Sequence, residues 1–441
     1  MNRLTERLRG VIEPAAPRAR PVAHDHSEIL GGEQHIADGH AFLIVDRRYP
    51  GGHRHGRVSV LDSLPPDSGV WPRMELLAGR QIPTASDDDR PRRLMFFDLE
   101  TTGLAGGAGT YAFLVGCGWF EGAAFRVRQF LLSSFGAERG ILKALTALAQ
   151  EAAAVVTFNG KSFDVPLIDT RYALNRMTSP FGDLPHLDML HVARRFWRQA
   201  DTDDEPRDED GTRSRGCRLA DLEQTVCGHE REGDVPGFEI PARYFHYVRS
   251  GDVSGLEAVL EHNRLDLLSL ALLTARASQM LEDGPGEASH AREALGLGTV
   301  YERAGCLAEA RAAYAHAAAV PGLPGAPASG CLARSDDATQ AEALRAYALL
   351  ARRERRFQDA ALAWQCLIEI RRCPPQLARE AAEALAVHHE HRVRDLDVAR
   401  RFALQSLQYR STPGRTQAVQ HRLSRLERKL GKPAAYTAGL F

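Results

Sequence analysis

The chain has 441 residues, of which 44% are hydrophobic, and its formal net charge is −1. This length is enough for two or three domains with a sizeable core. A nearly neutral charge argues against a strongly basic coat protein of nucleic acid, although it is compatible with a local basic groove. The 7 cysteines form no CxxC pair, which argues against a disulfide framework and a structural zinc site. We therefore expect a soluble protein of the reducing cytoplasm, without a signal peptide or a membrane helix.

The first part of the chain, residues 1–90, is rich in Pro, Gly, His and charged side chains, which predicts a partly disordered N-terminal extension. Within it we expect a short helix at 2–12, a weak strand at 41–45 and a linker at 87–93.

Two histidines of this extension, His53 and His55, flank Arg54. Imidazoles bind transition metals, but the sequence shows no partner carboxylate for them. The pattern is compatible with a metal site and does not by itself indicate one.

Residues 91–283 have the texture of an α/β domain. Short apolar runs typical of buried strands alternate with helical segments, and Glu121-Gly122 between two such runs predicts a hairpin. The expected strands are 94–99, 110–120, 125–132 and 154–158, and the expected helices are 137–153, 163–175, 187–198 and 253–280. This order predicts a mixed sheet flanked by helices. The charged, aperiodic segment 199–216 is expected to be a disordered insertion.

Residues 288–430 are rich in alanine and helical in pattern. Three windows repeat the small and aromatic positions of a tetratricopeptide repeat, where small residues let paired helices approach closely. The positions are Gly298, Tyr301, Ala310, Tyr314 and Ala317, then Ala360 and Trp364, then Ala399. We expect an all-α repeat domain, and a plain helical bundle is the alternative. The repeats either bind a protein partner or only support the α/β domain.

Asp98 and Glu100 are two residues apart on the first strand of the α/β domain, so their side chains point to the same face. Two carboxylates on an apolar strand are costly to bury without a cation, and hard oxygen ligands suit Mg²⁺ or Mn²⁺. A solvated strand end is the alternative for such a pair taken alone.

Asp164 belongs to the segment FNGKSFDVP, in which a strand ends, Asn-Gly forms a turn and a helix begins. In this first helical turn, Asp164 is either a helix cap or a third carboxylate that faces the strand. Lys161 is either solvated or placed to meet a phosphate.

His262 and Asp266 are four residues apart on a predicted helix and therefore share one face. Asp266 is the candidate fourth carboxylate, and His262 is the candidate general base, since its ordinary pKa suits proton transfer near neutral pH. An exposed ion pair is the alternative.

Taken together, the three segments resemble the DEDD exonucleases of the ribonuclease H-like superfamily, and the YprB-like branch in particular. The resemblance is carried by DLETTGLAGGAGTYAFLVG, FNGKSFDVPL, IPARYFHYVRSGD and HNRLDLLSL, and it covers residues 40–430. It implies a two-metal 3′→5′ exonuclease for single-stranded DNA or RNA, with Mg²⁺ or Mn²⁺ as cofactor.

The resemblance also implies roles for individual residues. Asp98 would bridge two ions, Glu100 and Asp266 would complete one site, and Asp164 would act through water or on the second ion. His262 departs from the family pattern, because it combines a histidine side chain with the spacing of the tyrosine subfamily. The expected substrate contacts are Thr101, Asn159, Lys161 and Asp188, of which Asp188 is equally a candidate helix cap.

Two other functions remain open at this point. One is an inactive nucleic-acid-binding or scaffold protein, which the presence of all four carboxylates disfavours. The other is a protein-interaction module in which the repeats dominate, since repeat arrays present concave binding surfaces.

Overall fold

The computed structural model describes residues 27–60, 62, 70–82, 93–103, 107–198, 217–326, 336–409 and 412–431. The chain forms two compact units, each built from separated stretches. The first unit contains Met1–His53, Ala85–Leu184 and Arg231–Leu268, and the second contains Arg54–Thr84, Pro185–Glu230 and Ser269–Phe441. The helix expected at 2–12, most of the linker at 87–93 and the insertion at 199–216 lie outside the described residues. No helix of the described part is long and apolar enough to cross a membrane.

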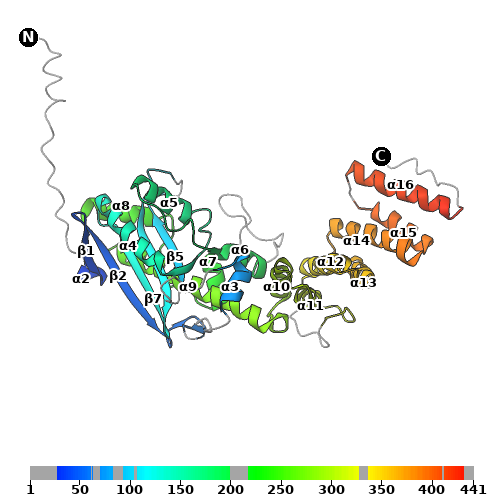
Figure 1. Cartoon of the computed structure of the whole chain (residues 1–441), viewed down its shortest axis with the longest axis horizontal. Helices are drawn as coiled ribbons and strands as arrows, with labels where there is room; N and C mark the ends of the chain where they lie inside the picture. Colours follow the sequence, from blue (N-terminus) through cyan, green and yellow to red (C-terminus); the bar gives the residue numbers. More distant parts are fainter. Residues whose placement is uncertain are drawn as a thin grey trace, which may run out of the picture. The chain divides into compact units, whose positions relative to one another are not determined.

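A mixed β-sheet forms the first unit, with the strand order β1-β2-β7-β6-β5-β8 (Figure 1). Strands β5 and β8 are parallel, whereas the other neighbouring strands of this unit are antiparallel. The bounds are β1 (Glu33–Ala37), β2 (His40–Pro50), β5 (Arg93–Thr101), β6 (Ala112–Glu121), β7 (Ala124–Leu131) and β8 (Ala152–Thr157). The predicted fold class, a mixed sheet with flanking helices, is confirmed.

The N-terminal region contributes more to this sheet than its composition suggested. The weak strand signal at 41–45 corresponds to β2, which pairs with β7 from Leu43↔Leu131 to Pro50↔Ala124. This part of the chain therefore completes the sheet. The compact units are discontinuous in sequence, whereas the expected domains are continuous. The expected domain boundaries remain a prediction.

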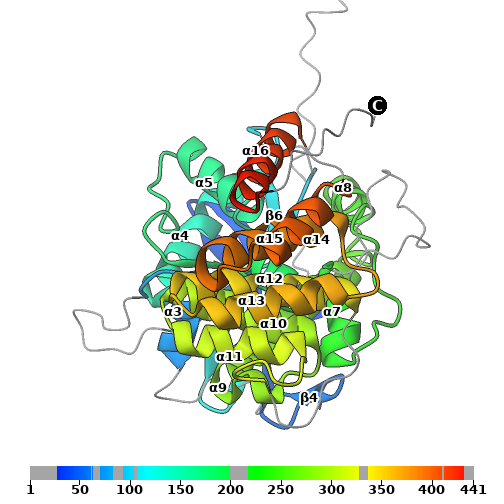
Figure 2. The ribbon, with the colours of Figure 1, turned by 90° about the vertical axis from the view of Figure 1, so that its right-hand side faces the viewer.

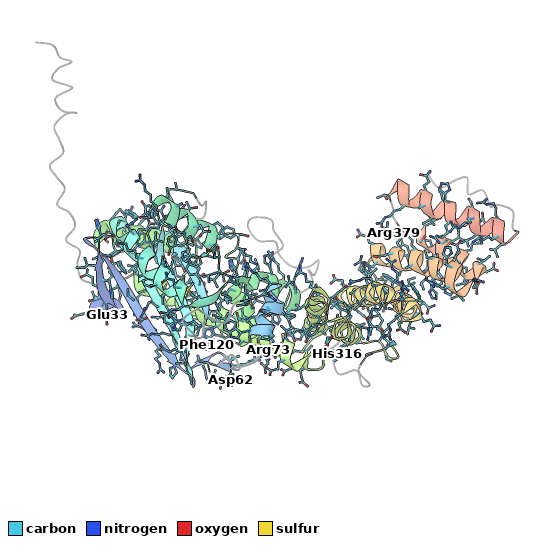
Figure 3. All side chains as sticks on the ribbon, in the orientation of Figure 1. Glu33, Asp62, Arg73, Phe120, His316 and Arg379 are labelled. Atoms are coloured by element: carbon cyan, nitrogen blue, oxygen red, sulfur yellow. The ribbon has the colours of Figure 1, made fainter. Side chains whose placement is uncertain are left out.

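The sheet is stabilised by apolar side chains on both faces, as expected for strands covered by helices. The hairpin β6–β7 forms as predicted, with Gly122 in the left-handed conformation of its turn. At one end of the sheet, Phe120 packs edge-on against Phe96 and Phe125, with ring centroids 6.1 Å and 5.0 Å away (Figure 3). Aromatic pairs in this geometry add to the free energy gained by burial.

Helices of the first unit pack on this sheet and fix its strand ends. They are α2 (Ser27–Leu30), α4 (Glu138–Gln150), α5 (Asp164–Leu174), α8 (Ile240–Ser250) and the part of α9 (Leu256–Asp283) up to Leu268. Tyr244 of α8 is buried, stacks on Phe113 at 4.1 Å between centroids and donates a hydrogen bond to Leu132 O. These contacts hold α8 against the sheet.

The second unit is mainly helical. Its early segments are β3 (Arg54–His55), β4 (Val58–Ser59), α3 (Val70–Ala78), β9 (His186–Asp188), α6 (Met189–Phe196), α7 (Leu219–Leu222) and the π-helical segment η3 (Glu223–Cys227). Its later helices are α10 (Ala291–Ala304), α11 (Leu307–Ala318), α12 (Asp337–Arg353), α13 (Phe357–Glu369), α14 (Pro375–His388), α15 (Leu396–Ser406) and α16 (Pro413–Lys429), with the π-helical segment η5 (His389–Val393) before α15.

The later helices pack in consecutive pairs, α10–α11, α12–α13 and α14–α15 (Figure 2). Their close approach depends on small residues. A Cβ at Gly298 would lie 2.4 Å from the ring of buried Tyr314, and Ala310 and Ala399 are fully buried. The predicted all-α C-terminal region is confirmed, while its assignment to the tetratricopeptide class remains a prediction.

Candidate active site

Asp98 and Glu100 lie near the end of β5 and are both partly buried. In the register with β6, Asp98 is opposite Gly116 and Glu100 is opposite Leu114. The pairing shifts between Glu100 and Thr101, so the strand becomes irregular directly after the second carboxylate. Strand alternation therefore places both carboxylates on one face, at the point where regular pairing ends.

A row of three residues across the sheet explains how Asp98 is held. Gly116 separates Asp98 on β5 from Gln129 on β7, and the space above this glycine is filled by the buried side chain of Asn263 from α9. Asn263 Nδ2 donates to Asp98 Oδ2 at 2.7 Å, and Asn263 Oδ1 accepts from Gln129 Nε2 at 2.8 Å. A Cβ at position 116 would lie 2.3 Å from Asn263 Oδ1. The glycine thus makes room for the amide that orients Asp98.

The four predicted carboxylates are electrostatically coupled. Burial and the negative charges of Asp266, Glu100 and Asp164 raise the pKa of Asp98 well above its usual range, against the lowering effect of the Asn263 hydrogen bond. Burial and the charges of Asp266, Asp164 and Asp234 likewise raise the pKa of Glu100 well above its usual range, and Arg231 opposes this. Asp164 is the first residue of α5, as predicted. Repulsion of this kind indicates a site in which negative charges are in excess over positive ones.

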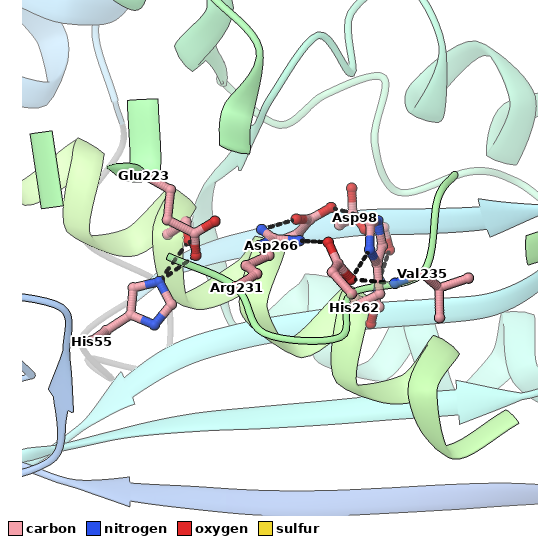
Figure 4. A network of polar contacts seen from close by, with 10 residues as sticks. His55, Asp98, Glu223, Arg231, Val235, His262 and Asp266 are labelled. Carbon is pink, nitrogen blue, oxygen red and sulfur yellow. Dashed lines mark hydrogen bonds and ion pairs between the residues drawn. The ribbon is translucent and has the colours of Figure 1, made fainter. Parts of the chain in front are cut away.

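His262 faces both the carboxylates and a fifth acidic residue. Its Nδ1 lies 2.7 Å from Asp234 Oδ1, and its Nε2 lies 3.6 Å from Asp266 Oδ2 (Figure 4). The predicted shared face of His262 and Asp266 is therefore present. Glu100, His262 and Asp266 each offer a ligand atom, and these atoms all lie within 4.8 Å of one another.

Arg231 is the cation that contacts this group most directly. Its Nη2 donates to Asp266 Oδ1 at 2.5 Å and its Nη1 donates to Asp234 Oδ2 at 3.1 Å, while its side chain is 7% exposed (Figure 4). Burial raises the pKa of Asp234, but the hydrogen bond and charge of His262 and the charge of Arg231 outweigh it, so that this pKa is lowered. The pKa of Asp234 thus lies below its ordinary value, in contrast to those of Asp98 and Glu100.

The residues expected to contact substrate do not all belong to the first compact unit, which contains the four carboxylates. Thr101 ends β5 and donates a hydrogen bond to Gly103 O at 3.0 Å. Asn159 takes a left-handed conformation with φ 65° in the turn before α5, and Lys161 is exposed in the same turn. Asp188 lies in the second unit, where it is 3% exposed and caps α6 by accepting from Leu190 N at 3.0 Å.

The sequence reasoning did not identify Arg231, Asp234, Gln129 or Asn263 as part of the site. A local signal existed only for Asn263, which lies inside the motif HNRLD between the two residues that were identified. The other three are brought in by the fold.

The donor set fits hard divalent cations. Carboxylate oxygens dominate it. Burial and mutual repulsion raise the pKa of two of the carboxylates, and a bound cation would relieve the repulsion. The residues that would hold such ions are Asp98, Glu100, Asp164 and Asp266.

Comparisons with known proteins agree with this geometry. Residues 95–278, which include all four carboxylates, match the family model described as RNase_H superfamily. The chain is also similar to the uncharacterized protein YprB of Bacillus subtilis (strain 168), with 29% identity over 406 residues, which cover 91% of this chain and 89% of that protein. Members of this superfamily usually use divalent metals, and the fold indicates a nuclease. The resemblance that the motifs indicated is thereby confirmed: residues 95–278 are similar to the RNase_H superfamily, and the chain as a whole is similar to YprB.

Proposed function

We propose that this protein is a metal-dependent 3′→5′ exonuclease that hydrolyses the phosphodiester bonds of single-stranded nucleic acid. The observation that carries the proposal is the gathering of Asp98, Glu100, Asp164 and Asp266, in which burial and the neighbouring charges raise the pKa of the first two. Bound cations would relieve this repulsion, and two-metal sites of this kind occur in nucleases, where they stabilise the attacking and leaving oxygens at a phosphodiester bond. The 3′→5′ polarity rests on the order of the motifs, which resembles that of the DEDD exonucleases.

The carboxylates divide the work of binding the ions. Asp98, Glu100, Asp164 and Asp266 would hold the Mg²⁺ or Mn²⁺ ions. When bound, these ions activate a water molecule and neutralise the charge that develops on the phosphate and the leaving 3′ oxygen. Asn263 keeps Asp98 in place through its 2.7 Å hydrogen bond.

His262 is the proposed proton acceptor. Asp234 accepts a hydrogen bond at 2.7 Å from His262 Nδ1, which leaves Nε2, on the side of Asp266, to take the proton of the attacking water. This arrangement supports a working base despite the unusual spacing of His262 and Asp266. Thr101, Asn159 and Lys161 are proposed to contact the substrate near this site, and the product would be a nucleoside 5′-monophosphate.

The proposal is tested with the full-length chain and 5′-labelled single-stranded DNA and RNA in Mn²⁺ or Mg²⁺. We expect stepwise shortening by the wild type and none by Asp98→Asn or Asp98→Ala. A substrate whose 3′ end is blocked should resist, whereas one blocked at the 5′ end should not. Equal degradation by wild type and both Asp98 variants would reveal a contaminating nuclease and refute the assignment.

One observation favours the alternative of an inactive binding or scaffold protein. Arg231 donates to Asp266 Oδ1 at 2.5 Å and so supplies part of the positive charge that an ion would bring. If Arg231 replaces an ion permanently, wild type will bind neither Mn²⁺ nor Mg²⁺, while Arg231→Ala will gain binding. If the site is catalytic, the wild-type protein will bind Mn²⁺ and will not need the Arg231→Ala substitution to do so.

A further inference from the structure

Within the second unit, the side chains of His55, Glu223 and His229 lie close together, although His55 is distant in sequence from the other two. His55 Nε2 lies 2.6 Å from Glu223 Oε1 (Figure 4). The imidazole rings of His55 and His229 stack with centroids 4.0 Å apart and an interplanar angle of 24°. One ligand atom from each of the three residues lies within 4.8 Å of the other two. The carboxylate that the sequence did not reveal beside His55 is therefore Glu223, 168 residues away.

Backbone contacts bring these segments together. Arg57 N donates to Cys227 O at 2.8 Å, which joins the β3–β4 hairpin to the end of η3. Gly56, with φ +65°, lies so close that a Cβ there would be 2.4 Å from Cys227 O. Gly228, with φ +66°, reverses the chain directly before His229. Two glycines in left-handed conformations thus allow the hairpin and the turn to approach at the point where the three donors meet.

The donors are removed from solvent to different degrees. His55 is 2% exposed and Glu223 is 1% exposed, whereas His229 is half-buried. A carboxylate in such a place needs a cation or strong hydrogen-bond donors. The half-buried position of His229 leaves a route by which an ion can reach the cluster from solvent.

The chemistry of the donors indicates which ions would bind. Two imidazoles and one carboxylate are a common ligand set for Zn²⁺ and related transition metals, and they suit Mg²⁺ and Ca²⁺ poorly. Ser269 Oγ lies 2.8 Å from His55 Nε2 and donates to Glu223 Oε1 at 2.6 Å. The hydroxyl that donates to Glu223 would fix the orientation of this carboxylate, as outer partners of metal ligands do.

We propose that His55, Glu223 and His229 form a metal site for one transition-metal ion of the zinc type. Two ligand atoms of a tetrahedral ion lie roughly 3.3 Å apart. Binding would therefore displace the proton between His55 and Glu223 and separate their present 2.6 Å contact by less than about 1 Å. The site shares no ligand with the carboxylate cluster, and the ion would fasten the β3–β4 hairpin to the turn at 228–229.

The test removes the other metal ligands first. In the full-length chain, Asp98→Asn with Asp266→Asn eliminates the carboxylate site and serves as the background. Into it we would introduce Glu223→Gln or His229→Ala, and His246→Ala as the matched control, because the side chain of His246 is 60% exposed. Each protein is stripped with a chelator, incubated with Zn²⁺ or Co²⁺ and desalted, and the retained metal is measured together with the visible spectrum of Co²⁺ and the Tm.

The background and the His246→Ala control should retain one equivalent of Zn²⁺, give the absorption of four-coordinate Co²⁺ and show a Tm raised by Zn²⁺. Glu223→Gln and His229→Ala should bind Zn²⁺ at least about 10-fold more weakly, because even outer partners of metal ligands contribute that much. Circular dichroism identifies a variant that unfolds. In that case the metal binding of the other variant tests the proposal.

No retained metal in the folded background would overturn the proposal, as would equal retention by Glu223→Gln, His229→Ala and the control. Either result would identify the cluster as a purely hydrogen-bonded contact. Because the background already lacks nuclease ligands, neither result bears on the proposed exonuclease.

Discussion

Glu390 of the helical region and Asp98 of the sheet are both carboxylates that lose hydration in the folded chain, but their neighbours differ in charge. Glu390 has a side chain with 0% exposure, and its two oxygens accept hydrogen bonds from Arg422 at 2.8 Å, Arg425 at 2.7 and 2.9 Å and Lys429 at 3.2 Å. Burial raises the pKa of Glu390, but these donors and their charges outweigh it and lower the pKa to about 2. Asp98 meets three other carboxylates, and its pKa is raised.

The difference separates a carboxylate whose charge the chain compensates from one whose charge it leaves in excess, as the proposed metal site requires. The arginine and lysine side chains of the same chain neutralise the charge of Glu390, so that region needs no cation from solution. The charges around Asp98 are in excess, and this excess persists in the folded protein only because the sheet and the helix α9 hold the residues there. Unfavourable local electrostatics of this kind are typical of functional sites.

The largest expected effect is on nuclease activity, which should depend on a carboxylate of the proposed metal site and not on Glu390. Glu100→Gln should reduce the rate of nucleic-acid hydrolysis by about 10³-fold, because the loss of one ion removes roughly 4 kcal/mol of transition-state stabilisation. Glu390→Gln should leave the rate per folded molecule unchanged. The measurement is single-turnover cleavage of a labelled oligonucleotide in Mn²⁺, with the folded fraction checked by circular dichroism. Equal losses in both variants would show that the comparison has no functional meaning.

A smaller effect is expected at Asp234, which differs from Asp98 and Glu100 because His262 and Arg231 compensate its charge and lower its pKa. Asp234→Asn should reduce the rate by about 10- to 100-fold, as changes of orienting partners commonly do. Binding of Mn²⁺, measured by calorimetry, should change much less, which distinguishes an orienting role from ligation. His262→Ala combined with Asp234→Asn should be no slower than His262→Ala alone, and additive losses would argue against the dyad.

The sequence predicted the site where its residues are close along the chain. Asp98 and Glu100 are two residues apart, and His262 and Asp266 are one helical turn apart, so strand and helix periodicity alone placed each pair on one face. Asn263 is separated by 134 residues from Gln129, and His262 by 28 from Asp234. No periodicity predicts such contacts, because they depend on how β7, α9 and the segment before α8 pack.

The same distinction applies to the fold. The hairpin β6–β7 was predicted because its turn is local, and the paired helices of the C-terminal region were predicted because their pattern repeats. The pairing of β2 with β7 was not predicted, since the 82 residues that separate Asp46 from Arg128 include the whole linker region. Their ion pair, with contacts at 2.9 and 2.7 Å, helps to fix that register.

The next effect is on stability. Glu390→Gln should destabilise the protein by about 2 kcal/mol, less than for a fully buried pair, since the cations around Glu390 are partly exposed. Because folding lowers the pKa of Glu390 from 4.5 to about 2, its contribution is present above pH 4.5 and is lost as the pH falls towards 2. Urea unfolding at pH 7 and pH 3 should therefore show a large difference between variant and wild type at pH 7 and a smaller one at pH 3. A constant difference would exclude the ionised carboxylate as the cause.

The smallest expected effect is a gain in stability, in contrast to the loss expected for Glu390→Gln. Folding raises the pKa of Asp98, so in metal-free protein its contribution to stability is greatest below its ordinary pKa of 3.8 and is lost as the pH rises through the raised value. Asp98→Asn cannot ionise and keeps an oxygen that can accept from Asn263, so its metal-free Tm should exceed that of the wild type by a margin that grows with pH. Addition of Mn²⁺ at high pH should stabilise the wild type more than the variant and reduce or reverse the margin. If Asp98→Asn is instead less stable than metal-free wild type at every pH, the carboxylates around Asp98 are not in excess, and the contrast with Glu390 fails at its physical basis.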